Sequence, residues 1–283
     1  MRIRRNKLEK TKVEDYKSNP APNEVLHDPN FLFDEPTHVY SLKDQPELKL
    51  TSATTFIHNY FAPFDREKIA SKLIQNVPKY QGCTKEDLFK DWEQSGISGT
   101  NVHNSLEHFI LEYSENGSAD YENSLQKCCV TDIERKKARH GMDWLGDNIF
   151  GKDHLKLYPE VRVVTRDWKI AGMIDLLVHD TKKDEYTILD WKTNKRISKK
   201  SYGGTVGSRE CTADLEDCNF THYTLQLSLY RYILEREYGL KVNKHALIHV
   251  SEDKATVHET EYLLSHIVAM FADAVKRGEI KWT

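Results

Sequence analysis

Two strand-like runs joined by a short polar connector constrain the fold of this chain more than any other feature. The runs are residues 172–178 (GMIDLLV) and 186–192 (YTILDWK), and the connector is HDTKKDE. Apolar and β-branched residues dominate the runs and turn-forming residues fill the connector, so the segment predicts a β-hairpin. If the hairpin is symmetric about Lys182 and Lys183, paired residues have numbers that add up to 365.

This register predicts two carboxylates directly opposite each other. Asp175 and Asp190 satisfy the sum, so their Cβ atoms should lie about 4.5–5.5 Å apart on one face. Carboxylates so placed between apolar residues repel each other, and a divalent cation removes that repulsion. Because side chains alternate along a strand, Lys192 should join the pair while Trp191 points away.

A hard cation beside an ammonium group suits phosphoryl chemistry. The metal polarises a phosphate oxygen and activates a water, while Lys192 orients that water or stabilises developing charge. The alternative is a surface hairpin in which Lys192 only pairs with an aspartate, and Asp-x-Lys alone does not decide between the two. The register and the apolar flanks favour a functional site. Gly172 fits as well, since its missing side chain lets a partner or substrate backbone approach closely.

Two further polar pairs stand four residues apart, the spacing of one helical face. His103 and Glu107 could provide a metal ligand and a group that orients it. Gln226 and Tyr230 offer neutral donors that suit a nucleic-acid backbone or a metal-bound water. Each pair also has a structural explanation, the first as a solvent-facing ion pair and the second as an amphipathic helix with a half-buried tyrosine.

The remaining periodicity predicts an α/β domain. A short hairpin is expected between residues 39–42 and 48–50. Helices are expected from a cap at Thr51 or Ser52 through 57, at 66–75, from Gly99 through 110, and at 132–150, 220–238 and 262–276. Strands are expected at 160–164, 170–178, 186–191 and 246–250. Helix, three strands, helix, strand, helix favours a mixed sheet flanked by helices.

The domain boundaries follow from the same pattern. Residues 1–30 are expected to be a basic, polar arm without fixed structure. Residues 31–283 are expected to form one domain, with a helical part at 51–150 and a catalytic core at 155–283.

The composition argues against several classes of protein. Charged residues make up 30% and hydrophobic ones 39%, which argues against a membrane protein or a mostly disordered one. The five cysteines contain no CxxC motif and no apolar leader precedes them, so an intracellular, reducing setting is expected rather than secretion. The net charge of −3 requires any nucleic-acid binding to use local basic patches.

One basic patch begins at the predicted catalytic lysine. Lys195, Arg196, Lys199 and Lys200 follow Lys192 closely, and such a run is either a solvated face or a grip on phosphates. Its position beside the predicted metal site favours the grip. Three nearby aromatic residues are available for base stacking or for ordinary packing: Tyr202, Phe220 and Tyr223.

Taken in chain order, these motifs resemble the RecB-type branch of the PD-(D/E)XK nucleases. The motifs of that branch are G-x-x-x-H, G-x-x-D, D/E-x-K and Q-x-x-x-Y. They stand here as residues 99–103 (GTNVH), 172–175 (GMID), 190–192 (DWK) and 226–230 (QLSLY). The resemblance covers roughly residues 35–280 and includes stand-alone exonucleases, such as the mitochondrial genome maintenance exonuclease and small nucleases of phages and large DNA viruses.

The resemblance implies a fold and a set of roles. The fold is a restriction-endonuclease-like core, a central mixed β-sheet flanked by helices, with an N-terminal helical and hairpin extension. Mg²⁺ or Mn²⁺ would be bound by His103, Asp175, Asp190 and the carbonyl of Trp191, and Lys192 would act with Asp175 and Asp190 in catalysis. The supporting residues would be Glu107, Glu160, Gln226 and Tyr230. The DNA-binding residues would be Lys195, Arg196, Lys199, Lys200 and Tyr223.

The implied activity is that of a metal-dependent deoxyribonuclease, an exonuclease acting on DNA ends or single strands in replication, recombination or repair. The alternatives are a structure-specific endonuclease and an inactive nucleic-acid-binding module, and RNA stays open as a substrate. No cysteine follows Tyr230, so the iron–sulfur cluster of several relatives is not expected. Without a Walker A pattern, ATP is not expected as a cofactor, and DNA rather than a membrane is the expected partner.

Overall fold

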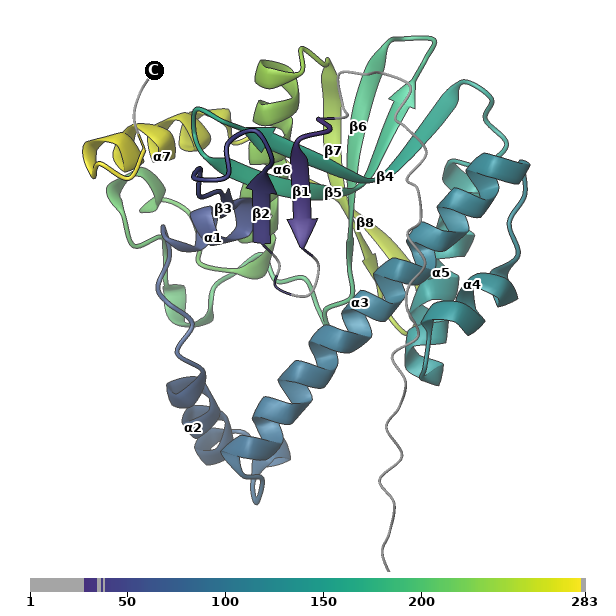
Figure 1. Ribbon diagram of the computed structural model, residues 1–283. Helices are drawn as coiled ribbons and strands as arrows, with labels where there is room; N and C mark the ends of the chain where they lie inside the picture. Colours follow the sequence, from purple (N-terminus) through teal and green to yellow (C-terminus); the bar gives the residue numbers. More distant parts are fainter. Residues whose placement is uncertain (1–27, 35–36, 38, 281–283) are drawn as a thin grey trace, which may run out of the picture.

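A six-stranded mixed sheet lies between two layers of helices in the computed structural model, which describes residues 28–34, 37 and 39–280 (Figure 1). Five strands follow the order β3 (Thr51–Ser52), β5 (Ile170–Asp180), β6 (Glu185–Lys192), β7 (Val242–Val250) and β8 (Ala255–Glu259), and β4 (Leu155–Thr165) pairs with β5. The β3–β5 and β6–β7 pairs are parallel and the other pairs are antiparallel. The predicted fold class, a mixed sheet flanked by helices, is confirmed.

Each face of the sheet has its own helices and its own core. One face is covered by α1 (Ala53–His58), α6 (Asn219–Glu237) and α7 (Leu264–Lys276), and the other by α3 (Lys85–Asn116), α4 (Tyr121–Cys128) and α5 (Asp132–Asn148). Successive residues of β6 enter different cores, since Ile188 packs with Leu229 of α6 and Leu189 with Met142 of α5. The two cores therefore fix the orientation of every side chain on this strand.

The hairpin of β5 and β6 has the predicted register. Leu176 pairs with Leu189, and these numbers add up to 365. The ladder ends at this pair, one step before Asp175 and Asp190. The backbone N–H of Trp191 donates instead to Asp175 Oδ2 at 2.8 Å. The aspartates therefore follow the predicted register, but they stand where the strands cease to pair.

The N-terminal hairpin differs from the prediction. β2 (Val39–Leu42) pairs with β1 (Phe31–Asp34), and residues 48–50 form no strand, so the predicted partner is wrong. Leu48 and Leu50 are partly buried side chains that pack against a small core. Their apolar alternation reflects this packing on β4 and β5. Residues 1–27 of the predicted arm lie outside the described residues.

Four segments differ in extent from the prediction or were not predicted: α3, β4 (Leu155–Thr165), α4 and β8. α3 begins at Lys85, earlier than Gly99, because Thr84 and Asp87 form a reciprocal capping box there. Pro159 lies inside β4, which tolerates a proline because β5 is its only partner among the described strands. The sequence analysis missed α4 and β8, which carry many polar residues.

The remaining helices are short or lie away from the sheet. They comprise α2 (Arg66–Asn76) and the 3₁₀ turns Pro78–Tyr80, Tyr202–Gly204 and Glu210–Thr212. The first helix, α1, begins as predicted, since the Ser52 side chain caps it by accepting from Thr55 N at 3.0 Å. No helix in the described part of the chain is long and apolar enough to span a membrane.

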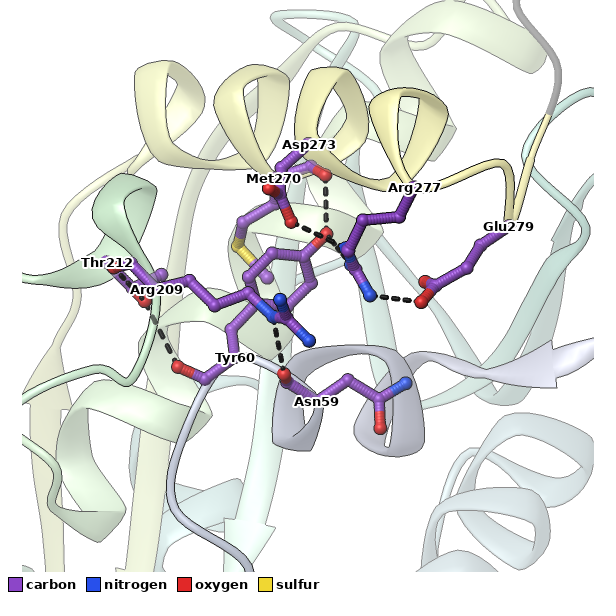
Figure 2. Close-up of polar contacts among 8 residues, drawn as sticks. All are labelled: Asn59, Tyr60, Arg209, Thr212, Met270, Asp273, Arg277 and Glu279. Atoms are coloured by element: carbon purple, nitrogen blue, oxygen red, sulfur yellow. Dashed lines mark hydrogen bonds and ion pairs between the residues drawn. The ribbon is translucent and has the colours of Figure 1, made fainter.

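A buried tyrosine fastens the segment after β6 to the helical layer (Figure 2). The hydroxyl of Tyr60 donates to the Met270 carbonyl of α7 at 2.5 Å and accepts from Arg277 at 2.9 Å. The Tyr60 carbonyl accepts from the Thr212 hydroxyl at 3.1 Å, and Arg209 donates to the Asn59 carbonyl at 3.1 Å. These bonds join α1, α7 and the loop between β6 and α6.

Candidate active site

An ion pair of Asp190 and Lys192 occupies the end of β6. Asp190 is 2% exposed, and Lys192 Nζ lies 4.5 Å from the centroid of the Tyr223 ring on α6. Trp191 points to the opposite face, where it packs edge-on against Trp144 of α5. The alternation predicted for these three residues of β6 is confirmed.

Burial and neighbouring charge perturb both members of this pair. Burial raises the pKa of Asp190 to about 7, and the Asp175 carboxylate adds to the rise while Lys192 opposes it. Burial acts to lower the pKa of Lys192, but the carboxylates of Asp190 and Asp175 outweigh it and raise the pKa. Lys192 is therefore a buried cation held in place by carboxylates.

The motif at residues 172–175 of β5 meets the motif at residues 99–103 of α3. His103 of α3 places Nδ1 3.4 Å from Asp175 Oδ2, and it also hydrogen-bonds to the Trp191 backbone. Burial lowers the pKa of His103, and the Asp175 carboxylate opposes this change. The neutral imidazole is favoured, and this is the form that can bind a metal ion.

Glu160 lies in the middle of β4, whereas the sequence analysis placed it at the head of a strand. Its φ of 50° is in the left-handed region, which is uncommon for a residue with a side chain. Pro159 pairs with Leu176 and Val161 with Ile174, so Glu160 stands opposite Asp175 where the ladder is interrupted. Strained residues of this kind cluster at functional sites.

The carboxylates around Glu160 repel one another. Burial, followed by the charges of Asp175, Glu107 and Asp190, raises the pKa of Glu160 well above its usual value. Four acidic side chains from α3, β4, β5 and β6 thus share one region of low dielectric. A cation placed among them would relieve the repulsion.

Three of these four acidic residues, Glu107, Glu160 and Asp175, open onto a cleft of about 1180 Å³. Its lining includes His103, Glu107, Glu160 and Asp175, together with residues of the hairpin β1–β2, of α3 and α5, and of the loop after β6. Asp190 and Lys192 do not line the cleft. They lie behind Asp175, whose charge acts on the pKa of both.

The metal prediction agrees with the chemistry of these donors. Carboxylate oxygens suit Mg²⁺ or Mn²⁺, a neutral imidazole can add a ligand to a transition-metal ion, and the crowding around Glu160 favours a cation. Among the described residues, however, no group of three or more His, Cys, Asp or Glu side chains is arranged closely enough to hold a metal ion.

Gly172 allows the close approach of Tyr230. A Cβ atom at Gly172 would lie 2.4 Å from Tyr230 Cε1, so the close neighbour is the side chain of this tyrosine and not the backbone of a partner or substrate, as was predicted. Gln226 donates to the Tyr230 hydroxyl at 3.0 Å. Tyr230 is 3% exposed, so it supports β5 from beneath and has no surface available for DNA.

The predicted basic run divides into two parts. Lys195 and Arg196 line the cleft. Lys199 lies over the Phe220 ring at 4.6 Å, and Lys200 pairs with Glu216 at 3.0 Å, both outside the cleft lining. The structure thus places two of the four cations beside the acidic residues.

The sequence analysis missed the aromatic residues of the cleft. Phe33 and Tyr40 line it next to Glu160, and Tyr80 and Trp92 line it farther along α3. No residue spacing marks them, because they come from separate elements that only the folded chain brings together. The predicted stacking candidate Tyr202 is 93% exposed and lies outside the cleft lining.

The sequence matches the family described as the PD-(D/E)XK nuclease superfamily over residues 79–280. This chain belongs to that superfamily. Nuclease activity on a nucleic acid is accordingly its function class, and enzymes of this kind generally use divalent metal ions such as Mg²⁺ or Mn²⁺.

No curated protein matches the chain. Among solved structures, one titled "Crystal structure of SSO0001" is similar at 13% sequence identity and a TM-score of 0.28. The match covers 64% of this chain and 76% of that one. A TM-score this low carries no argument about fold or function.

Proposed function

We propose that this chain is a metal-dependent deoxyribonuclease of the RecB-type branch, an exonuclease that hydrolyses phosphodiester bonds at DNA ends or in single strands. One observation carries the proposal. His103 of α3, Glu160 of β4 and Asp175 of β5 line one end of the cleft, and the Asp190–Lys192 pair of β6 lies near enough for the charge of Asp175 to act on both of its members. The order and chemistry of these residues match the motifs of that branch.

The residues that would hold the cation are His103, Asp175, Asp190 and the carbonyl of Trp191, with Glu160 and Glu107 as outer carboxylates. When bound, the cation would supply positive charge to a phosphate oxygen and favour ionisation of a water. His103 and Asp175 are already in contact, and the Trp191 backbone hydrogen-bonds to both, so three of these groups lie side by side.

Lys192 would orient the attacking water or stabilise charge that develops on the phosphate. Its carboxylate neighbours keep it protonated despite burial, so its positive charge persists at neutral pH. The Tyr223 ring restricts its position from one side. Gln226 and Tyr230 would support this arrangement indirectly, by fixing the distance between α6 and β5 at Gly172.

The basic run would bind the DNA backbone. Lys195 and Arg196 line the cleft beside the acidic residues, where they offset the repulsion between carboxylates and phosphates. Lys199 and Lys200 would contact phosphates farther along, outside the cleft. Residues 31–283 would work as one nuclease domain that needs neither ATP nor an iron–sulfur cluster.

The test is incubation of labelled DNA with the full chain in Mg²⁺, Mn²⁺ or EDTA. The substrates are single- and double-stranded DNA in linear and circular form, with RNA as a separate arm. We expect metal-dependent degradation of linear DNA, whereas circular DNA should stay uncut. Cleavage of circles would identify the endonuclease, and binding without metal-dependent cleavage of any substrate would identify an inactive binding module.

A further inference from the structure

We infer that Tyr80 and Trp92 form a stacking site for unpaired bases at the far end of the cleft, so that the nuclease takes its DNA as a single strand. This inference rests on the proposed function and adds a substrate class to it. It starts from an arm made of α2 (Arg66–Asn76), the 3₁₀ turn Pro78–Tyr80 and the first turns of α3, which projects away from the sheet (Figure 1).

The arm carries more aromatic surface than its own packing needs. In α2 the buried residue is Ala70, and in the part of α3 before Val102 it is Leu88. Beside this small core stand four aromatic side chains that are only partly covered, and the most exposed of them, Phe64, is 69% exposed. The four are Phe64, Tyr80, Phe89 and Trp92.

Trp92 is held in a fixed orientation by its neighbours. Phe64 meets it edge-on at 5.7 Å between ring centroids, and Phe89 lies 5.6 Å away. The Arg66 guanidinium covers the Phe89 ring at 3.8 Å from its centroid. A braced ring loses little conformational freedom when a base stacks on it, which favours binding.

The arm site and the acidic residues share one cleft. Tyr80 and Trp92 line the same cavity as His103 and Asp175. Trp92 and His103 belong to one helix, and at about 1.5 Å of rise per residue they lie about 16 Å apart along its axis. This span corresponds to a few nucleotides of one strand.

Small side chains of α3 line the cleft between these two points. They are Ser95, Gly96, Ser98, Gly99 and Thr100. A Cβ atom at Gly96 would meet no atom within 4 Å, so the helix leaves open space there. A strand that follows α3 from the acidic residues to Trp92 meets one longer side chain of this helix in the cleft lining, Gln94, and it does so only next to Trp92.

An unpaired base is the ligand that fits this arrangement. In a duplex, neighbouring bases cover both faces of each base, whereas an unpaired base offers a face to an aromatic ring. Stacking tolerates any sequence, because every base has such a face. Lys195 and Arg196, in the same cleft, supply the positive charge that a phosphate backbone requires.

The first experiment measures binding of a labelled oligo-dT strand in EDTA by fluorescence anisotropy. Trp92→Ala and Tyr80→Ala should each weaken binding by about 5- to 150-fold, the range reported by alanine substitution of a stacking residue. Trp92→Phe keeps a ring and should retain most of the affinity. Val268→Ala is the control, because Val268 is 42% exposed on α7 and outside the cleft lining, and it should bind like wild type.

The second experiment moves one abasic site stepwise along the strand. In wild type, one position should lower affinity as much as Trp92→Ala does, and the variant should be insensitive to the missing base at that position. Two results would overturn the inference. One is equal affinity of wild type and Trp92→Ala for the intact strand, and the other is that no abasic position weakens binding by wild type while leaving binding by Trp92→Ala unchanged. Metal-dependent cleavage by wild type tests the proposed function separately, since it does not depend on the outcome at Trp92.

Discussion

The two ends of the cleft are built in different ways. At the sheet end, Asp190 and Tyr230 are 2% and 3% exposed, and Tyr230 belongs to the core on the α6 face of the sheet. At the arm end, Phe64 is 69% exposed and Ala70 and Leu88 are the buried residues beneath it. Under the proposed function, the groups that would take part in the chemistry are fixed by the body of the protein, whereas the rings proposed to stack on bases stand on a segment with little core. Substitutions at the two ends should therefore affect different quantities.

The largest effect is expected at Lys192. Lys192→Ala should lower the rate of single-turnover cleavage of pre-bound DNA by about 10²–10³-fold, because the lost charge acts mainly in the transition state. Lys192→Arg should not restore the rate, since a planar guanidinium cannot replace a compact ammonium above the Tyr223 ring. DNA affinity should change little in either variant.

A comparable cleavage rate in Lys192→Ala would reduce this lysine to a structural partner of Asp190. A thermal unfolding curve for each variant is the necessary control, because removal of Lys192 leaves the buried Asp190 without its cation.

Alanine substitutions of one glycine at each end of the cleft should change the free energy of unfolding in opposite directions. Gly172→Ala should lower the free energy of unfolding by about 1–3 kcal/mol, because its Cβ meets the buried Tyr230 ring at 2.4 Å. Gly96→Ala meets no atom within 4 Å and should raise it by about 0.5–1 kcal/mol through helix propensity. Urea denaturation measures both, and a tolerated Gly172→Ala would contradict the packing described at the sheet end.

The two halves of the basic run should differ in the salt dependence of DNA binding. Lys195→Ala with Arg196→Ala removes both cations from the cleft and should reduce the slope of log affinity against log salt by about 1.4 for a single strand. Lys199→Ala with Lys200→Ala is the matched control, in which one cation already pairs with Glu216. If both double variants reduced the salt slope equally, the position of a cation inside or outside the cleft would have no influence on DNA binding.

The smallest effect concerns two capping boxes of the same type. Thr131 caps α5, whose Glu134 is fully buried, so Thr131→Ala should lower the free energy of unfolding by about 1 kcal/mol. Thr84→Ala at the start of α3 should instead fray the arm and change global unfolding by less. Hydrogen exchange would show the difference as faster exchange confined to the arm. Equal global losses would mean that the arm unfolds together with the sheet.

The part of the fold that local pattern controls was predictable. The register of β5 and β6 follows from the turn residues and from the alternation on each strand, and it holds at Leu176 and Leu189. The start of α3 at Lys85 was not predicted for two reasons. Gly99 interrupts the apolar pattern, and the segment that follows the Thr84 capping box is polar. The partner of β2 could not be predicted, since Leu48 is as apolar as Phe31 and both pack in the same small core, where only the strand pairing of Phe31 distinguishes them.

The candidate site shows the same division. Asp175, Asp190 and Lys192 lie in short motifs on paired strands, so spacing alone brings them together. Glu160 joins them through the interrupted pairing of β4, which no sequence pattern indicates. Trp92 depends on where α3 starts and on how α2 packs against it, so its position in the cleft became visible only in the structure.

The central claim is that the carboxylates at the sheet end make cleavage metal-dependent. The direct measurement is Mg²⁺- and Mn²⁺-dependent cleavage of labelled linear DNA by wild type, Asp175→Asn and Asp190→Asn, with Asp147→Asn on the exposed face of α5 as the matched control. We predict that both site variants bind DNA but do not cut it, while Asp147→Asn cuts like wild type. Near-normal metal-dependent cleavage by either site variant would contradict the account.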